Sequence, residues 1–69
     1  MDEKELENRF TYHAPKGDQP ATYESIRDRG WNMAIYLSAV CPDCRELSIA
    51  VTKIEEAVMW ANAAIARHA

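Results

Sequence analysis

Three groups of side chains in this sequence could bind or transform a ligand: a cysteine pair, a set of cations and a short aromatic segment. Cys41 and Cys44 form a C-x-x-C turn, CPDC, which can act as a redox pair or as half of a zinc site. Neither His13 nor His68 is near this turn in the sequence, and a thioredoxin-type motif needs a βαβ context. We interpret CPDC as a structural turn, with metal binding and redox chemistry as alternatives.

The sequence contains no evident catalytic constellation. Glu55 and Glu56 are adjacent and point in different directions on a helix, so they do not form a paired-carboxylate site. A Gly-rich phosphate loop is absent, and the spacing supports no Ser/His/Asp set. We therefore predict a protein that is not an enzyme and that has no catalytic residues, no cofactor and no metal.

Residues 9–20, RFTYHAPKGDQP, carry most of the groups suited to ligand binding. Two prolines and a glycine rule out a long helix here, and Phe10 alternates with Tyr12 among polar residues. We therefore predict an extended arm over residues 9–19. The alternative is that the two aromatic rings only fix a loop to the helices. The candidate binding side chains of the arm are Arg9, Tyr12, His13 and Lys16.

A long helix that could position this arm is predicted over residues 43–67. No Gly or Pro interrupts this stretch, and apolar residues recur every three or four positions, which places them on one helix face. Asp43 and Glu46 have the spacing of a capping box, and Arg67 and His68 suit the C-terminal end of the helix dipole. The predicted stripe consists of Leu47, Ala50, Val51, Ile54, Ala57, Val58, Ala61, Ala64 and Ile65.

Another helix is predicted over residues 20–40, with Pro20 in its first turn, where the missing N–H is not needed. Gly30 inside this helix costs ~1 kcal/mol relative to alanine, so either packing offsets that cost or Gly30 permits a close backbone approach. The predicted stripe consists of Tyr23, Ile26, Gly30, Met33, Ala34, Leu37 and Val40.

The link between the two helices is short, which makes them antiparallel neighbours. The predicted fold class is therefore all-α: an antiparallel αα-hairpin with an N-terminal arm, in a single domain over residues 1–69. Residues 1–8, MDEKELEN, are strongly charged and form either a frayed helical turn or a disordered start.

An antiparallel hairpin brings the beginning of its first helix close to the end of its second. Arg27 and Arg29 would then lie near Arg67 and His68, and the arm would enter at the same end. Arginine forks bind phosphate, and aromatic and guanidinium planes stack on bases, so this end would suit a small anionic, aromatic ligand. The alternative is a solvated charged end, because both helices also carry acidic residues.

The hairpin has a further set of apolar side chains outside its two stripes: Trp31, Ile35, Ile49, Met59 and Trp60. A chain of 69 residues buries only ~60% of its unfolded surface, and a two-helix unit cannot cover both apolar sets. We therefore expect self-association. The alternative is that the N-terminal segment folds over these side chains.

The charge and hydropathy of the chain exclude several classes of partner. A net charge of −3 gives no general attraction to DNA, RNA or anionic membranes. There is no long apolar run and no N-terminal signal sequence, so we expect a soluble, cytoplasmic protein.

Nearly the whole chain resembles a known family. The segments RFTYHAPKGDQPATYESIRD and CPDCRELSIAVTKIEEAVMWANAAIAR closely resemble the small phage anti-CBASS type 2 proteins, which are cyclic-oligonucleotide sponges. The phrase EEAVMWANAAIAR is especially specific. The resemblance implies a helical protomer that assembles into a homohexamer in the infected bacterial cell. It also implies capture of cyclic dinucleotides and, at separate sites, cyclic trinucleotides, without chemistry on the ligand.

The resemblance also implies roles for single residues. The conserved tyrosine of the family matches Tyr12, and a basic residue near the beginning of the following helix matches Arg27. The trinucleotide-binding arginine matches Arg67, with Arg45 as the second choice. Two positions depart from many relatives, since Cys44 stands where they have serine and Gly30 where they have a better helix former.

Two other functions remain open at this point. One is a structural or adaptor hairpin that binds a host protein through Trp31, Met59 and Trp60. The other is a small metal or redox protein that uses Cys41 and Cys44. The sequence does not determine which cyclic nucleotides a sponge would prefer, because any base offers a face on which an aromatic ring can stack.

Overall fold

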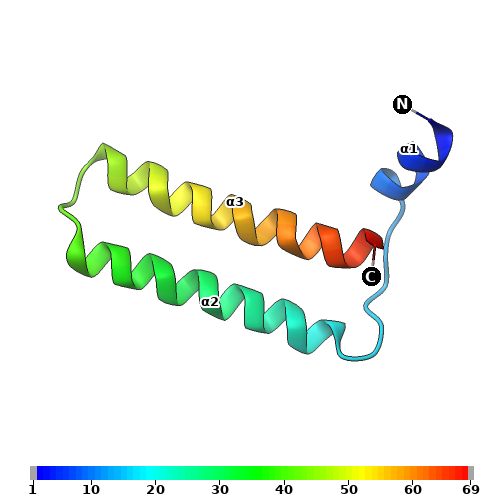
Figure 1. The fold of residues 1–69 in the computed structure, drawn as a ribbon, viewed down its shortest axis with the longest axis horizontal. Coiled ribbons are helices and arrows are strands. Elements are labelled where there is room, and N and C mark those ends of the chain that lie inside the picture. Colours follow the sequence, from blue (N-terminus) through cyan, green and yellow to red (C-terminus); the bar gives the residue numbers. More distant parts are fainter. Residues whose placement is uncertain (1, 69) are drawn as a thin grey trace.

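Two long helices form the predicted antiparallel hairpin. The computed structural model describes residues 2–68, and within this range the elements are α1 (Glu3–Phe10), α2 (Gln19–Val40) and α3 (Arg45–His68), with no strand. α2 and α3 run side by side and make the main helix–helix contact (Figure 1). The connection after α1 passes the end of α3 and reaches the beginning of α2, so it crosses the open end of the hairpin.

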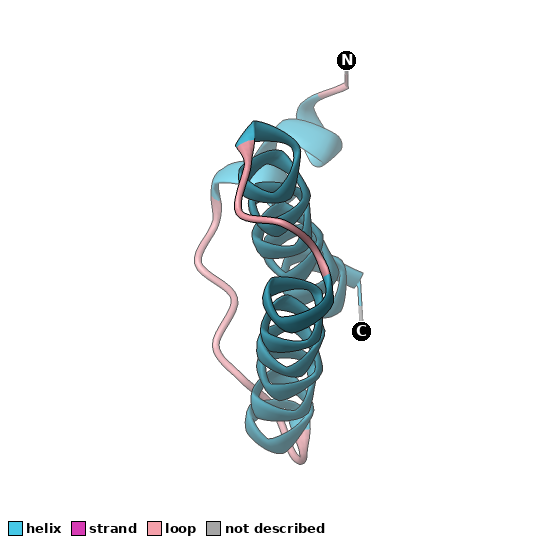
Figure 2. Ribbon diagram, turned by 90° about the vertical axis from the view of Figure 1, so that its left-hand side faces the viewer, coloured by secondary structure: helices cyan, strands magenta, loops and turns pink. Residues whose placement is uncertain are grey.

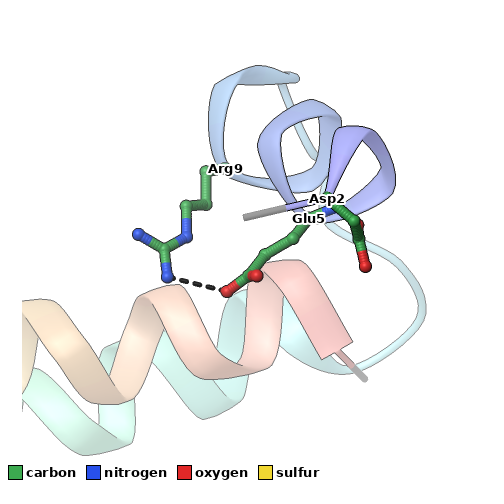
Figure 3. A network of polar contacts seen from close by, with 3 residues as sticks. All are labelled: Asp2, Glu5 and Arg9. Carbon is green, nitrogen blue, oxygen red and sulfur yellow. Dashed lines mark hydrogen bonds and ion pairs between the residues drawn. The ribbon is translucent and has the colours of Figure 1, made fainter.

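The charged N-terminal segment forms a short helix. The Asp2 carboxylate caps α1 by accepting a hydrogen bond of 2.8 Å from the Glu5 backbone N–H. One turn further on, Arg9 donates to Glu5 over 2.8 Å (Figure 3). α1 therefore extends through Arg9 and Phe10, two residues into the segment predicted as extended, because the cap and the i, i+4 ion pair favour the helix. The arm proper comprises residues 11–18.

The CPDC turn ends α2 and delays the start of α3. Pro42 disfavours helical geometry at the preceding residue, and Cys41 accordingly has φ −102° and ψ 147°, while its N–H still donates to the Leu37 carbonyl over 2.9 Å. α3 begins at Arg45, and the Cys44 carbonyl accepts from the Ser48 N–H over 3.2 Å. The predicted capping box with Asp43 at the N-cap is therefore wrong, because Cys44 occupies that position.

The contact between α2 and α3 is narrower than the sequence predicted. The predicted stripe positions Met33 and Val40 of α2 and Ala57 and Ala64 of α3 are exposed. Because a straight helix has 3.6 residues per turn, only a narrow line of side chains on each helix touches the neighbouring helix. The outer members of a wide apolar stripe lie beside that line and stay exposed. The half-buried stripe residues are Tyr23, Ile26, Gly30, Ala34, Leu37, Leu47, Ala50, Val51, Ile54, Val58, Ala61 and Ile65.

The two helices approach each other closely at Gly30. A Cβ atom at this position would lie 2.6 Å from Cγ2 of Val58 and 3.6 Å from Cγ2 of Ile54. The first distance is far shorter than a van der Waals contact, and the χ1 angle of a helical valine is stiff. Of the two explanations for Gly30, the structure therefore supports the close backbone approach.

Residues 2–68 of a single protomer form no enclosed core. The protomer measures 45 × 29 × 12 Å, so it is one helix thick, and none of the side chains in residues 2–68 is buried. The arm lies to one side of the plane of the two helices (Figure 2) and leaves Trp31 68% and Trp60 60% exposed. The alternative in which the N-terminal segment covers the outer apolar side chains is therefore wrong.

We predict that Gly30→Ala lowers the free energy of unfolding by up to ~2 kcal/mol, because overpacking against Val58 costs ~1–3 kcal/mol and alanine gains only ~1 kcal/mol in helix propensity. In a Val58→Ala background, which removes the clash, the same substitution should instead stabilise the hairpin. Urea unfolding followed by circular dichroism, at one fixed protomer concentration, measures both effects. Stabilisation by Gly30→Ala in both backgrounds would show that the helices are not this close.

Candidate functional site

The open end of the hairpin contains a pocket of about 350 Å³, here called the Tyr12 pocket. Three separate parts of the chain build it: the arm, the first turns of α2 and the last turns of α3. Small side chains on α3 leave the space, while aromatic and polar side chains surround it. The lining residues are Tyr12, His13, Pro15, Tyr23, Arg27, Asn62, Ala63 and Ala66.

Local hydrogen bonds set the course of the arm through this pocket. Nε2 of His13 lies 2.8 Å from the carbonyl oxygen of Asn8, and because a carbonyl only accepts, the ring nitrogen donates. At the other end of the arm, Gly17 has a φ of +52°, which glycine adopts without strain. Next to this turn the Lys16 N–H donates to Oε1 of Gln19 over 3.0 Å. These anchors leave the Tyr12 ring 81% exposed, with a face open for stacking.

A second pocket, here called the Arg67 pocket, lies between α1 and the end of α3 and measures about 430 Å³. It combines cations with two exposed aromatic rings, Phe10 and Trp60. None of its lining residues belongs to the Tyr12 pocket. The lining residues are Glu5, Asn8, Arg9, Phe10, Trp60, Arg67 and His68.

The structure thus divides the predicted group of binding residues into three places. Tyr12, His13 and Arg27 share one pocket, and Arg9 and Arg67 share the other. Lys16 belongs to neither, since it lies in a shallow depression with Gln19, Thr22 and Ile65 among others. Arg45, the second choice for trinucleotide binding, lies at the first turn of α3, next to the CPDC turn and away from both pockets.

The arginines of the two pockets differ in their electrostatic surroundings. Arg9 already has an anionic partner, since it forms an ion pair with Glu5 at 2.8 Å. The other ion pair within residues 2–68 joins Lys53 to Glu56, so neither Arg27 nor Arg67 has a carboxylate partner in the described protomer. Their positive charge is available to an anionic ligand, whereas Arg9 already has a carboxylate partner in a half-exposed ion pair.

Sequence reasoning missed one polar residue of the Tyr12 pocket and misjudged another. The missed residue is Asn62, which is half-buried and interrupts an alanine-rich stretch. The misjudged residue is Tyr23, which the sequence pattern assigns only to the helix contact. The signal for Asn62 was its spacing, because it follows Val58 by four positions and precedes Ala66 by four. Residues so spaced share one helix face, so an asparagine among them lies on the side that α2 covers.

An apolar groove runs along the hairpin beside the Tyr12 pocket. It measures about 590 Å³, and Arg27 and Asn62 line both the groove and the pocket, so they separate the two. Its apolar lining comes from both helices: Gly30, Trp31, Ala34, Val51, Ile54, Val58 and Met59. An open groove of this size on a folded protein is typical of an interaction surface.

The CPDC turn lies at the opposite end of the hairpin from both pockets (Figure 1). Cys41 is half-buried, Cys44 is exposed, and both are free thiols. Among residues 2–68 no group of three or more His, Cys, Asp or Glu side chains could hold a metal ion. In the same range no helix combines the length and apolar character needed to cross a membrane.

A family model described as "Acb2/Tad1, hairpin domain" matches residues 1–66. No curated protein and no solved structure matches the chain. The match covers both sides of the Tyr12 pocket and ends one residue before Arg67. It confirms the resemblance to the anti-CBASS type 2 sponges, a family that binds and sequesters its ligands. With nearly its entire length matched, this chain belongs to the Acb2/Tad1 hairpin-domain family.

Proposed function

We propose that this protein is a phage immune-evasion sponge that binds cyclic dinucleotides and cyclic trinucleotides without changing them. By holding these second messengers it deprives the effectors of host CBASS defence of their activating signal. The observation that carries the proposal is the family match over residues 1–66, which includes the residues that build the Tyr12 pocket. Family membership supports sequestration rather than catalysis.

We assign cyclic dinucleotides to the Tyr12 pocket. Its volume of about 350 Å³ is within the range of small-molecule sites, and it combines a flat ring with an uncompensated guanidinium. The Tyr12 ring would stack on a base, and Arg27 would donate charge-assisted hydrogen bonds to a phosphate. His13 would contribute Nδ1 as an acceptor when its ring is neutral, because Nε2 donates to Asn8.

We assign cyclic trinucleotides to the Arg67 pocket. It is separate from the Tyr12 pocket and about 430 Å³ in size. Arg67 provides a half-buried cation without a carboxylate partner in the described protomer, and Phe10, which is 86% exposed, provides a ring for stacking. Two arginine-containing pockets fit the two ligand classes that the family resemblance implies.

We further propose that several protomers assemble, as a homohexamer, with a second copy of the chain on the apolar groove. One protomer exposes 5653 Å², whereas a folded monomer of its mass, 7.9 kDa, exposes ~4,400 Å². The difference of ~1,200 Å² exceeds the ~800 Å² per partner that a standard protein interface buries. A monomeric mass in solution would contradict the assembly and leave the groove to a different protein.

Tyr12→Ala and Arg27→Ala should each weaken binding of a cyclic dinucleotide by roughly ten- to a hundredfold. A stacked base contributes ~1–3 kcal/mol and a hydrogen bond to a charged group ~1.5–3 kcal/mol, and ~1.4 kcal/mol corresponds to a factor of ten. Titration calorimetry with 3′,3′-cyclic GMP–AMP measures the change. Helicity should stay as in the wild type, because both side chains are exposed in the protomer. Arg27 also lines the apolar groove, so the oligomer mass of each variant is measured as a control.

The matched control for this measurement is Arg29→Ala. Arg29 is an exposed arginine two positions from Arg27 on the same helix, and it does not line the Tyr12 pocket. Its removal should leave the affinity within about twofold, since it lies outside the site. Wild-type affinity in the folded Tyr12→Ala and Arg27→Ala variants would show that the dinucleotide binds elsewhere.

Arg67→Ala should weaken binding of a cyclic trinucleotide by tenfold or more and leave dinucleotide binding nearly unchanged. The reason is that Arg67 lines only the second pocket, whereas the Tyr12 pocket remains intact. Calorimetry with cyclic tri-AMP and with 3′,3′-cyclic GMP–AMP on the same preparation measures both affinities. Equal losses for the two ligands would mean a single shared site or damage to the assembly.

A further inference from the structure

Two polar atoms of the Tyr12 pocket have no hydrogen-bond partner. The hydroxyl oxygen of Tyr23 and Oδ1 of Asn62 are both shielded from solvent, and no other group in residues 2–68 bonds to them. Tyr23 comes from α2 and Asn62 from α3, and both side chains are half-buried in the wall of the pocket. In the described part of the chain, these are the two buried side-chain oxygen or nitrogen atoms that have no hydrogen-bond partner.

The helix contact alone does not account for these polar groups. A buried hydroxyl or amide without a partner destabilises a folded protein, whereas an apolar group of the same shape does not. Asn62 follows Val58 by four residues on the face that α2 covers, where leucine would fill a similar volume. Phenylalanine at position 23 would keep the ring and omit only the hydroxyl. The polar groups therefore point to a partner outside the protomer that completes their hydrogen bonds.

The chemistry of Oδ1 restricts what that partner can be. A carbonyl oxygen only accepts, so its partner must carry an N–H or O–H. The phosphates of a nucleotide are hydrogen-bond acceptors at neutral pH. Arg27, which lines the same pocket, would donate to them. The N6 amino group on the edge of adenine is a donor that an asparagine amide recognises well. Because Oδ1 is shielded in the protomer, a ligand in the pocket meets it only after the amide turns about its soft terminal torsion.

We propose that Asn62, supported by the Tyr23 hydroxyl, reads the amino group of a purine base stacked in the Tyr12 pocket. This inference rests on the proposed function and names its specificity-determining residues. Tyr12 and Arg27 contact parts that every cyclic dinucleotide has, a base face and a phosphate. Asn62 and Tyr23 distinguish ligands by the polar edge of the base. The wild-type protein therefore prefers amino-bearing purines to purines that lack the amino group.

The test compares 3′,3′-cyclic GMP–AMP with cyclic di-inosine monophosphate, which has purine bases without exocyclic amino groups. By calorimetry, the wild type should bind the first at least tenfold more tightly. Asn62→Leu should reduce this ratio to within about twofold, mainly by weakening the amino-bearing ligand, and Tyr23→Phe should reduce it partly. The matched controls Asn32→Leu and Tyr36→Phe change exposed residues of α2 that do not line the pocket, and they should keep the wild-type ratio.

Thermal unfolding without ligand separates this role from a structural one. Asn62→Leu and Tyr23→Phe should leave the melting temperature unchanged or raise it, because each removes an unpaired buried polar atom. A fall in melting temperature or oligomer mass would show that these atoms bond within the assembly and would overturn the inference. Equal weakening of both ligands by Asn62→Leu would also overturn it, since the partner would then be a ribose hydroxyl.

The outcome for the wild type separates this inference from the proposed function. If the wild type binds cyclic dinucleotides and loses them on Arg27→Ala, but Asn62→Leu keeps the wild-type ratio, only the base-reading role is wrong. If the wild type binds neither ligand, the assignment of cyclic dinucleotides to the Tyr12 pocket fails, and the role of Asn62 fails with it.

Discussion

A pair of antiparallel helices can bury only one face of each helix, and this constraint governs the whole protomer. α2 and α3 approach so closely at Gly30 that Val58 occupies the space of a missing Cβ atom. The contact covers the facing sides of α2 and α3. Large apolar side chains such as Trp31 and Met59 lie outside it. The protomer is therefore one helix thick, and its outer faces are exposed.

The same constraint explains why the Tyr12 pocket lies at the open end of the hairpin. There the helices are joined by no turn, and the arm passes the end of α3 on its way to the beginning of α2 (Figure 1). Ala63 and Ala66 on α3 leave space that larger side chains would fill, and the arm adds an exposed aromatic ring. A binding site can thus form although no side chain in residues 2–68 is buried, because three chain segments meet at one end. Assembly through the neighbouring groove would hold those segments in place.

Sequence periodicity was sufficient for the hairpin, because apolar spacing and the short CPDC link follow directly from helix geometry. It was not sufficient for details that depend on packing. α3 starts at Arg45 rather than at the predicted Asp43, and the Cys44 carbonyl accepts its first backbone hydrogen bond. In the site, charge and aromaticity drew attention to Tyr12 and Arg27, whereas Asn62 was hidden in an alanine-rich helix. Predicting that the cations divide between two pockets would need the path of the arm, and apolar periodicity does not encode that path.

The central claim, that the protein captures its ligand intact, is tested most directly by recovering that ligand. The protein is incubated with 3′,3′-cyclic GMP–AMP, separated from free ligand by size-exclusion chromatography, and then denatured by heat. Mass spectrometry of the released fraction should find the cyclic dinucleotide chemically unchanged and in a fixed ratio to protomers. Ligand that elutes apart from the protein, or that is recovered as a linear or hydrolysed product, would contradict the account.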